Sequence, residues 1–577
     1  MASRFNIFLI FNTIFLVLML WAFDGHCAID DVHDADILMI SGRMTDTHGK
    51  PVKSVSVSLT IRDAHQTMTR ETVTDDDGRY TIKTPFPAGT LPAAKIHLEA
   101  RKPSYAPSVT KDIHTVKAEA RDRGSTFYLA ETDLIMKRIV SPALWISAAV
   151  LLMVYILIGF EIVHRTSAAL AGAAVLLGIS HLIGPFFSEF DIIRFDTAAR
   201  AVDLNVILLL FSMMIIVGIS EKTGMFQWLA YSCYRLSGGR IPLLCAALMG
   251  ATALISAFLD NVTTMLLVIP VSIQIAAALK INPIALLLPE VFASNVGGAA
   301  TLIGDPPNIM IGSYAKLTFI DFSKNLAIPC FIVLIISIFF FLLYFRHEYS
   351  QSQPESHGRE TDDPSSRYAI TDARLLVLCL IFLGMTILLF MVHGMFEMAP
   401  GVAALMGAAA LLIMSRVDLV KLLEKNIEWP TLVFFAALFV VVAAAEESGL
   451  IHLIADYVRN VSTGSYVMSL LIILWTSAII SAFIDNIPFT ATMLPVVAYM
   501  TTTVHPDQAN GLWWALALGA CLGGNGTLIG ASANLVTVGM AEKAGHNISF
   551  FKYMRICFIP MILSILVCSA WLLLVWK

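Results

Sequence analysis

Apolar stretches long enough to cross a membrane recur from residue 142 to the end of the chain, separated by short polar segments. About 20 apolar residues in a helix span the hydrocarbon core of a bilayer. The pattern predicts two sets of six elements, each with five crossings and one hairpin that enters and leaves on the same side. The first set is expected at 142–160, 168–186, 204–220, a hairpin 242–279, a broken span 283–311, and 326–345. The second set is expected at 374–392, 401–415, 430–446, a hairpin 467–501, a broken span 512–540, and 556–575.

Five crossings are an odd number, so the second set must start on the opposite face of the membrane, and the two sets form inverted repeats. The predicted inside segments carry 15 Lys and Arg residues, whereas the outside segments after residue 142 carry 6. This distribution agrees with the positive-inside rule. We therefore expect transporter repeats at 142–345 and 374–577, joined by a polar, flexible cytoplasmic linker at 346–373.

The N-terminal part of the chain has a different pattern. Residues 1–28 contain Arg4 and then an apolar run, which predicts a signal peptide or an uncleaved signal anchor. Residues 36–130 predict a small β-domain, because Ser54–Thr60 alternates with period two and glycine-containing turns lie before and after it. Either reading of the signal puts this domain outside the cytoplasm.

Composition supports the membrane assignment. The 577 residues are 57% hydrophobic and 14% charged, with a mean hydropathy of +0.75, which excludes a soluble globular protein. The net charge of −5 gives no reason to expect a nucleic-acid partner. The 8 cysteines form no metal-binding spacing, and no Walker loop, His-Glu-x-x-His or Gly-x-Ser-x-Gly motif occurs. We expect no cofactor and no enzymatic activity, so active transport must draw on an ion gradient or a separate subunit.

Two polar phrases inside the apolar region occur twice. Ser256–Thr264 returns 225 positions later as Ser481–Thr490, and Gly297–Asn308 returns 226 positions later as Gly523–Asn534. Both copies of the first phrase fall midway through a predicted hairpin, and both copies of the second interrupt a predicted span. Paired Gly/Pro-interrupted apolar segments in two halves are the best sequence indication of a transporter's binding site.

The hairpin tips carry the candidate ion ligands. A carboxylate in the membrane is costly and usually functional, so we expect Asp260 and Asp485 to bind Na⁺ or H⁺, with Asn261 and Asn486 as neutral ligands. The structural alternative is that each Asp caps a helix or accepts a hydrogen bond from a nearby hydroxyl. Half-helix N-termini at the breaks also suit an anion. The remaining candidate substrate residues are Ser256, Thr263, Gly297, Gly298, Thr301, Asp305, Asn308, Ser481, Thr490, Gly523, Gly524, Asn525, Thr527 and Asn534.

The motifs at Ser256–Thr264, Gly297–Asn308, Ile484–Met493 and Cys521–Asn534 resemble those of a known group. They are similar to the P-protein-like members of the arsenite-permease, sodium–proton-antiporter and citrate-carrier group of the ion transporter superfamily. The resemblance covers roughly residues 142–577. It implies an all-α polytopic carrier with inverted repeats, re-entrant hairpins and broken helices, working as a dimer by an elevator-like motion. The segment 36–130 resembles carboxypeptidase-regulatory-like, transthyretin-type β-sandwich domains.

One departure from this group bears on the substrate. Related dicarboxylate carriers have Ser-Asn-Thr at the tips, whereas this chain has Asp260-Asn261-Val262 and Asp485-Asn486-Ile487. The missing hydroxyls argue against dicarboxylate binding and favour Na⁺ or H⁺ exchange, with a small inorganic ion as substrate. A cation-coupled anion or oxyanion carrier, an anion channel, and a membrane-anchored binding protein remain alternatives. The expected location is a bacterial inner membrane.

Overall fold

The computed structural model describes residues 35–46, 51–52, 55–62, 67–75, 77–87, 95–102, 105–106, 108–111, 116–118, 127–137, 141–238, 240–350, 370–462, 465–501 and 510–576. The chain divides into two compact units, Met1–Ile139 and Val140–Lys577. The predicted signal segment 1–28 lies outside the described residues, as does 351–369 of the predicted linker.

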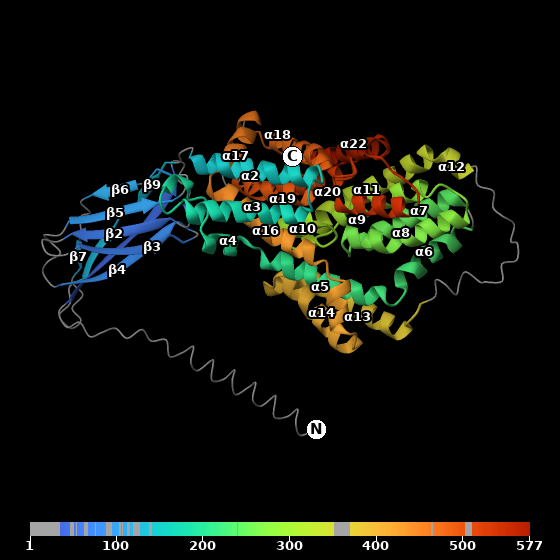
Figure 1. The fold of residues 1–577 in the computed structure, drawn as a ribbon, viewed down its shortest axis with the longest axis horizontal. Coiled ribbons are helices and arrows are strands. Elements are labelled where there is room, and N and C mark those ends of the chain that lie inside the picture. The colour runs from blue at the N-terminus through green and yellow to red at the C-terminus, as the bar shows by residue number, and fades with distance from the viewer. Residues whose placement is uncertain are drawn as a thin grey trace, which may run out of the picture. The chain divides into compact units, whose positions relative to one another are not determined.

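The described part of the first unit consists of strands in two sheets (Figure 1). The strands are β1 (Ala35–Asp46), β2 (Ser56–Arg62), β3 (Thr67–Val73), β4 (Arg79–Pro87), β5 (Lys95–Arg101), β6 (Ser108–Lys111), β7 (Val116–Ala118), β8 (Phe127–Glu131) and β9 (Leu134–Met136). One sheet has the order β4-β1-β8-β7, with β9 paired to β1, and the other has the order β3-β2-β5-β6. Strand β1 runs antiparallel to β4 and parallel to β8.

Alternation along the strands builds the core of this unit. Leu38 and Ile40 of β1 and Val57, Leu59 and Ile61 of β2 are buried, while their neighbours are more exposed. Successive side chains of a strand point to opposite faces, so every second residue enters the core. The strand predicted at 54–60 is therefore present, displaced by two residues.

The first half of the second unit contains the helices α2 (Pro142–Gly159), α3 (Arg165–Leu182), α4 (Phe195–Ala201), α5 (Leu204–Glu221), α6 (Met225–Leu236), α7 (Ile241–Ser256), α8 (Asn261–Ala278), α9 (Ile284–Ala299), α10 (Pro306–Ala315), α11 (Phe319–Tyr344) and α12 (Arg346–Ser350), with a 3₁₀ turn at Ser188–Phe190. The hairpin predicted at 242–279 is the pair α7 and α8. The broken span predicted at 283–311 is the pair α9 and α10.

The second half contains α13 (Ala373–Val392), α14 (Pro400–Ser415), α15 (Leu419–Lys425), α16 (Trp429–Glu447), α17 (Leu450–Val461), α18 (Tyr466–Phe483), α19 (Asn486–Tyr499), α20 (Asn510–Gly523), α21 (Ser532–Lys543) and α22 (Phe550–Val575), with a 3₁₀ turn at His393–Phe396. The hairpin predicted at 467–501 is the pair α18 and α19, and the broken span predicted at 512–540 is the pair α20 and α21. The fold class expected from the sequence is confirmed.

Nine helices among the described residues are long and apolar enough to cross a membrane. Proline opens several helices of this unit, at Pro142, Pro242, Pro306, Pro400 and Pro430. Its missing N–H costs nothing in the first turn, where no intrahelical acceptor is available. Helix boundaries are therefore well marked in the sequence.

The structure adds short helices that the span pattern did not include. Helices α4, α6, α15 and α17 connect the long ones. The first residues of the predicted linker are not extended, because α12 occupies Arg346–Ser350 and Tyr349 is buried. The Tyr349 hydroxyl donates to the carbonyl of Ala285, Oη–O 2.7 Å, which ties this helix to the start of α9.

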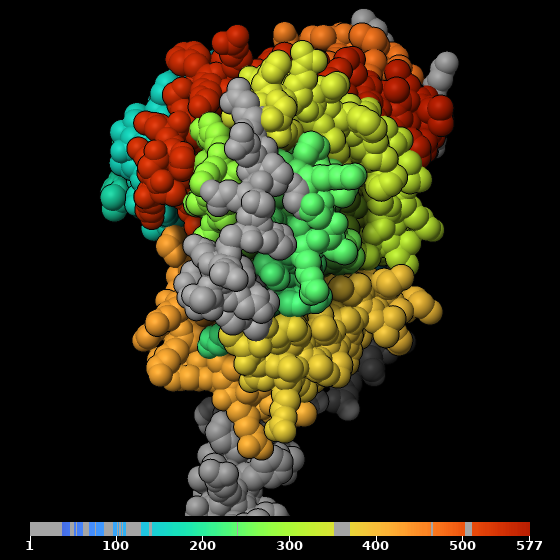
Figure 2. Space-filling model, turned by 90° about the vertical axis from the view of Figure 1, so that its right-hand side faces the viewer, coloured from blue at the N-terminus to red at the C-terminus, as the bar shows by residue number. Residues whose placement is uncertain are grey.

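The two halves exchange partners reciprocally. Helix α5 packs on α14 and α16 packs on α3; in the same way α10 packs on α19 and α21 packs on α8. These contacts between the halves thus occur in pairs with the roles swapped, as the predicted repeats require. In a view turned by 90°, green and yellow segments of the first half share one face with orange and red segments of the second (Figure 2).

Candidate functional site: two hairpin tips and two broken helices

Each hairpin breaks at an aspartate that caps the returning helix. Asp260 precedes α8, and its Oδ2 accepts hydrogen bonds from the Thr263 backbone N–H (3.0 Å) and hydroxyl (2.9 Å). Asp485 precedes α19, and its Oδ1 accepts from the Ile487 N–H (3.0 Å). The cap alternative raised from the sequence is therefore real for both, but one carboxylate oxygen of each remains free of these cap bonds.

The broken spans are held open by a matched pair of asparagines. Asn308 Nδ2 donates to the carbonyls of Thr301 (2.8 Å) and Ala299 (3.1 Å). Asn534 Nδ2 donates to the carbonyls of Thr527 (2.9 Å) and Gly524 (2.8 Å). Backbone without helical partners at membrane depth must be satisfied by protein. Both side chains, predicted to contact the substrate, donate their amide N–H groups to the loop backbone.

Glycines let the hairpins and the broken helices touch. A Cβ on Gly297 would collide with the backbone of Ala253 in α7, and one on Gly523 would collide with the backbone of Ala478 in α18. Gly298 and Gly524 pack in the same way against the glycines at the far side of each loop, Gly304 and Gly530. Small residues at helix contacts in membranes allow this close approach.

The candidate hydroxyls also join tips to loops. Thr301 donates to the carbonyl of Ala257, and Thr527 donates to that of Ala482. Ser481 donates to Ala520 O at 2.6 Å, and Ser294 donates to the Ser256 hydroxyl at 3.1 Å. The remaining one, Thr490, is buried, and its hydroxyl has no hydrogen-bond partner in the described part of the chain. It is therefore not the partner of Asp485 that the sequence had suggested.

Asp305 lies where the two tips meet. Its carboxylate accepts from Asn261 Nδ2 (Oδ1, 3.3 Å) and from Asn486 Nδ2 (Oδ2, 3.2 Å), one amide from each hairpin. The side chain is almost fully buried, with 1% of its surface exposed. The aligned residue in the second half is Ala531. The pair of tips thus shares a single buried carboxylate supplied by the first broken span.

A second polar connection was missed in the sequence. Asn295, in the middle of α9, donates to Asn525 Oδ1 (2.9 Å) and Asn534 Oδ1 (3.0 Å), and its own Oδ1 accepts from Asn261 (3.1 Å). Asn525 is fully buried, and its Nδ2 has no hydrogen-bond partner among the described residues. Asn295 aligns with Cys521 in the second half, so the repeat comparison gave no signal for it.

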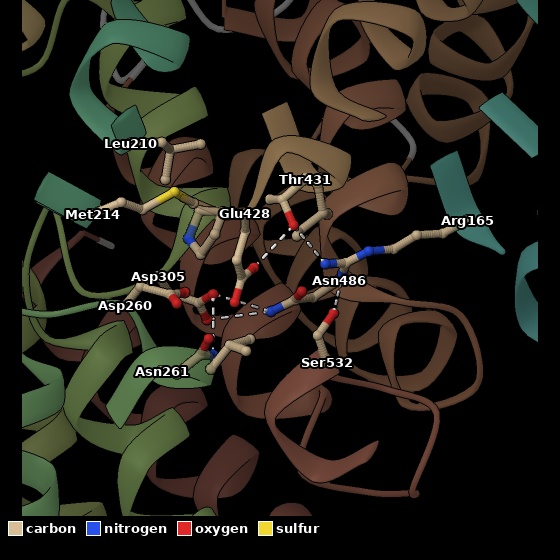
Figure 3. A pocket seen from close by; sticks show the side chains of 13 residues that line it. Arg165, Leu210, Met214, Asp260, Asn261, Asp305, Glu428, Thr431, Asn486 and Ser532 are labelled. Atoms are coloured by element: carbon tan, nitrogen blue, oxygen red, sulfur yellow. Dashed lines mark hydrogen bonds between the residues drawn. The ribbon is translucent and has the colours of Figure 1, made fainter. Parts of the chain in front are cut away.

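A small cavity of about 20 Å³ lies between the tips (Figure 3). A cavity of this size holds about one water molecule, so a small ion also fits. The charged groups in its lining are Asp260, Asp305, Glu428 and Arg165. Asn261, Asn486, Thr431 and Ser532 add uncharged polar groups, and Leu210 and Met214 of α5 lie on the apolar side. Four of the predicted site residues thus meet: Asp260, Asn261, Asp305 and Asn486.

A wider cavity of about 610 Å³ adjoins this one and shares Arg165, Val262, Glu428, Thr431 and Ser532 with its lining. Asp485 lines the wider cavity. The guanidinium of Arg165 lies 3.7 Å from Asp485 (Nη1–Oδ2) and donates to the hydroxyls of Ser532 and Thr431, the latter at 2.9 Å. Arg165 was expected only as a cytoplasmic loop charge. Its side chain instead enters the site from the first turn of α3.

Glu290, another acidic residue of the first half, does not line either cavity. It is buried in α9, and its Oε1 accepts from the Ser272 hydroxyl at 2.7 Å. It therefore lies apart from the meeting point of the tips.

Inverted repeats that bring two broken hairpins and two broken spans to one polar cavity define a membrane transporter. The chain belongs to the citrate transporter family, whose model matches residues 155–519. The carboxypeptidase regulatory-like domain model matches residues 39–128. The protein is thus a multi-pass membrane protein with an additional β-domain.

Curated relatives agree with this class. An uncharacterised transporter of Mycobacterium tuberculosis is 39% identical over 411 residues, covering 71% of this chain and 93% of the relative. The P protein of Homo sapiens is 34% identical over 509 residues, covering 74% of this chain and 59% of that protein. Among solved structures, the YdaH transporter of Alcanivorax borkumensis is 16% identical, with a TM-score of 0.48 over 71% of this chain and 98% of that one.

Proposed function

We propose that the protein is a secondary active transporter coupled to Na⁺ or H⁺, which exchanges ions by alternating access at the cavity between the repeats. The observation that carries this proposal is the position of Asp305. Its buried carboxylate contacts the tips of both repeats through Asn261 and Asn486. A charge at this depth is costly unless it is neutralised. A bound cation or proton supplies that neutralisation, and its arrival or departure acts on both repeats at once.

The charges of the two cavities favour a cation over an anion. Their linings contain five carboxylates, of Glu161, Asp260, Asp305, Glu428 and Asp485, against one guanidinium. That guanidinium already faces Asp485. A free anion entering this path meets more negative than positive charge, whereas a small cation is attracted. The proposed cation ligands are Asp260 and Asp305, with the side-chain oxygens of Asn261 and Asn486.

The orientation follows from the charges of the loops. The wider cavity opens beside Glu161–Arg165 and Glu428–Thr431, segments that the positive-inside rule assigns to the cytoplasm. The cavity is then the cytoplasmic entrance of an inward-facing state. The same orientation makes the β-domain extracytoplasmic. We propose a bacterial inner membrane as the location, from the predicted signal segment, and a homodimer as the assembly, from the family resemblance.

Proton flux in proteoliposomes tests the proposal. Vesicles containing the full chain and a pH-sensitive dye would receive Na⁺, Li⁺, K⁺, chloride, arsenite and citrate in turn under an imposed proton gradient. Proton movement triggered by a cation supports the proposal. A response to an anion alone, or large unitary currents without coupling, contradicts it and indicates an anion carrier or a channel.

A further inference from the structure

The two hairpin tips have a similar backbone arrangement, but the aspartates at the two tips have different charged neighbours. At the second tip, Asp485 faces the guanidinium of Arg165 and accepts a hydrogen bond from Ser532 (Oγ–Oδ2, 2.9 Å). Only 6% of the Asp485 side chain and 21% of the Arg165 side chain are exposed. At the first tip, Asp260 has no ion pair within the described residues and lines the small cavity instead.

The hydroxyl groups that bind Arg165 occur only in the second half of the chain and have no counterparts in the first. Ser532, which accepts from the guanidinium, aligns with Pro306 in the first half. Thr431, which accepts from its other end, aligns with Val206. Neither proline nor valine has a hydroxyl, so the first tip has no equivalent cradle for an arginine. Helix α14, which corresponds to α3, begins with Pro400 and Gly401 and brings no cation.

The loops of the two broken spans also differ, with the charged residue in the first half. The first half has Asp305 beside its tip, where the second half has Ala531. The loop after the first tip therefore supplies a carboxylate that the second loop lacks, whereas the ion pair of Arg165 is with Asp485 of the second tip. The carboxylate of Asp485 is paired with Arg165 within the protein. Around the small cavity of about 20 Å³, the carboxylates of Asp260, Asp305 and Glu428 outnumber the one guanidinium, that of Arg165, which already faces Asp485.

We propose that Arg165 occupies, as a tethered cation, the position at the second tip that a mobile cation occupies at the first. This inference rests on the proposed function, and it specifies that one exchangeable cation binds per chain, between Asp260 and Asp305. Arginine suits the role because its guanidinium stays protonated in proteins. It also donates to Thr431 and Ser532 while facing Asp485, and the phenyl ring of Phe434 lies under it at 5.5 Å from the ring centroid.

Removing the tethered cation should turn the second tip into an ion site. The first experiment measures ²²Na⁺ binding to the purified full chain. Wild type is expected to bind one Na⁺ per chain, and Arg165→Ala is expected to gain a second. The double variant Arg165→Ala/Asp485→Asn should not gain it, because the second tip then has no carboxylate. Arg165→Gln, which keeps a polar side chain and removes the charge, serves as a second variant with the same expected gain. An unchanged stoichiometry in both single variants, with wild type binding Na⁺, overturns the inference.

A second readout does not depend on which ion is transported. Arg165→Ala leaves a space shaped for a guanidinium beside Asp485, so methylguanidinium chloride should raise its thermal unfolding midpoint relative to choline chloride at equal concentration. Wild type and the double variant should not respond. No rise for Arg165→Ala, or an equal rise for the double variant, overturns the inference even if no variant binds Na⁺.

The two proposals fail in different ways. A wild type without coupled cation flux contradicts the proposed function, whatever Arg165→Ala does. Coupled flux that Asp260→Asn abolishes, together with the absence of a methylguanidinium effect, leaves the proposed function standing and removes the role of Arg165.

Discussion

The side-chain amide of Asn486 donates to the carboxylate of Asp305 at 3.2 Å, although the two residues are 181 positions apart. Asn486 belongs to the tip of the second hairpin and Asp305 to the break in the first repeat. Asn261, from the first tip, reaches the same carboxylate at 3.3 Å. One buried carboxylate thus contacts both tips, and in the proposed function this contact couples ion binding to movement of the repeats.

Replacing Asn486 with leucine should weaken ion binding. Leucine has a similar volume but removes the donor to Asp305, and a hydrogen bond to a charged group contributes about 1.5–3 kcal/mol, so the apparent affinity for the coupling cation should fall about 10-fold or more. The dependence of flux on cation concentration measures this. Asn325→Ala, whose amide bonds only within α11, is the control. An unchanged half-saturating concentration for Asn486→Leu would remove Asn486 from the site.

Asn308 and Asn534 should matter for stability more than for ion affinity. Each loses at least two hydrogen bonds to loop carbonyls when replaced by alanine, and these carbonyls stay buried. The expected loss is about 2–4 kcal/mol of unfolding free energy per variant. Thermal unfolding in detergent measures the loss, and flux per folded molecule measures function. A variant with unchanged stability and lost ion affinity would make the asparagine a ligand instead.

Gly297→Ala and Gly523→Ala should separate the broken helices from the hairpins. An added Cβ at either position meets the backbone of Ala253 or Ala478, which a side-chain rotation cannot relieve. Both variants should be destabilised and transport poorly. Gly250→Ala is the matched control, because a Cβ there meets nothing within 4 Å and alanine favours the helix. Equal unfolding midpoints for all three variants would contradict the close packing described above.

The β-domain should lose stability at alkaline pH through Tyr80. Burial, and then the nearby charge of Asp133, raise the pKa of Tyr80 well above its ordinary value of 10.0, and its hydroxyl donates to Thr132 O at 2.6 Å. A group whose pKa is raised on folding contributes fully below its unfolded pKa, and the contribution is lost as the pH rises above it. Unfolding midpoints of the full chain should therefore fall above pH 10.0 more steeply for wild type than for Tyr80→Phe. Parallel pH profiles would contradict this account.

The architecture could be predicted well from the sequence because each hairpin tip and each helix break is marked by a motif that occurs once in each repeat. Asp260 and Asp485 mark both tips, and Gly297 and Gly523 mark both close approaches. A single polar residue in an apolar run is ambiguous, whereas two copies at a fixed offset are not.

The residues that were missed are those without a counterpart. Arg165 lies next to a helix start, where a basic residue normally faces the cytoplasm, and its partners Thr431 and Ser532 are more than 200 positions away. Asn295 has no polar equivalent in the second repeat. Arg165, Thr431 and Ser532 are brought together only by the packing of α3, α16 and α21 around the second tip. No local sequence pattern predicts that packing.

The central claim is that the Asp305 carboxylate couples cation binding to transport. The most direct measurement is proton flux driven by an imposed Na⁺ gradient across proteoliposomes containing wild type, Asp305→Asn or Asp418→Asn. Asp418 is an exposed helix cap whose pKa is lowered by the backbone N–H of Lys421, so it controls for loss of an acidic residue that lines neither cavity. The account predicts coupled flux for wild type and Asp418→Asn and none above empty vesicles for Asp305→Asn. Wild-type flux in Asp305→Asn would contradict it.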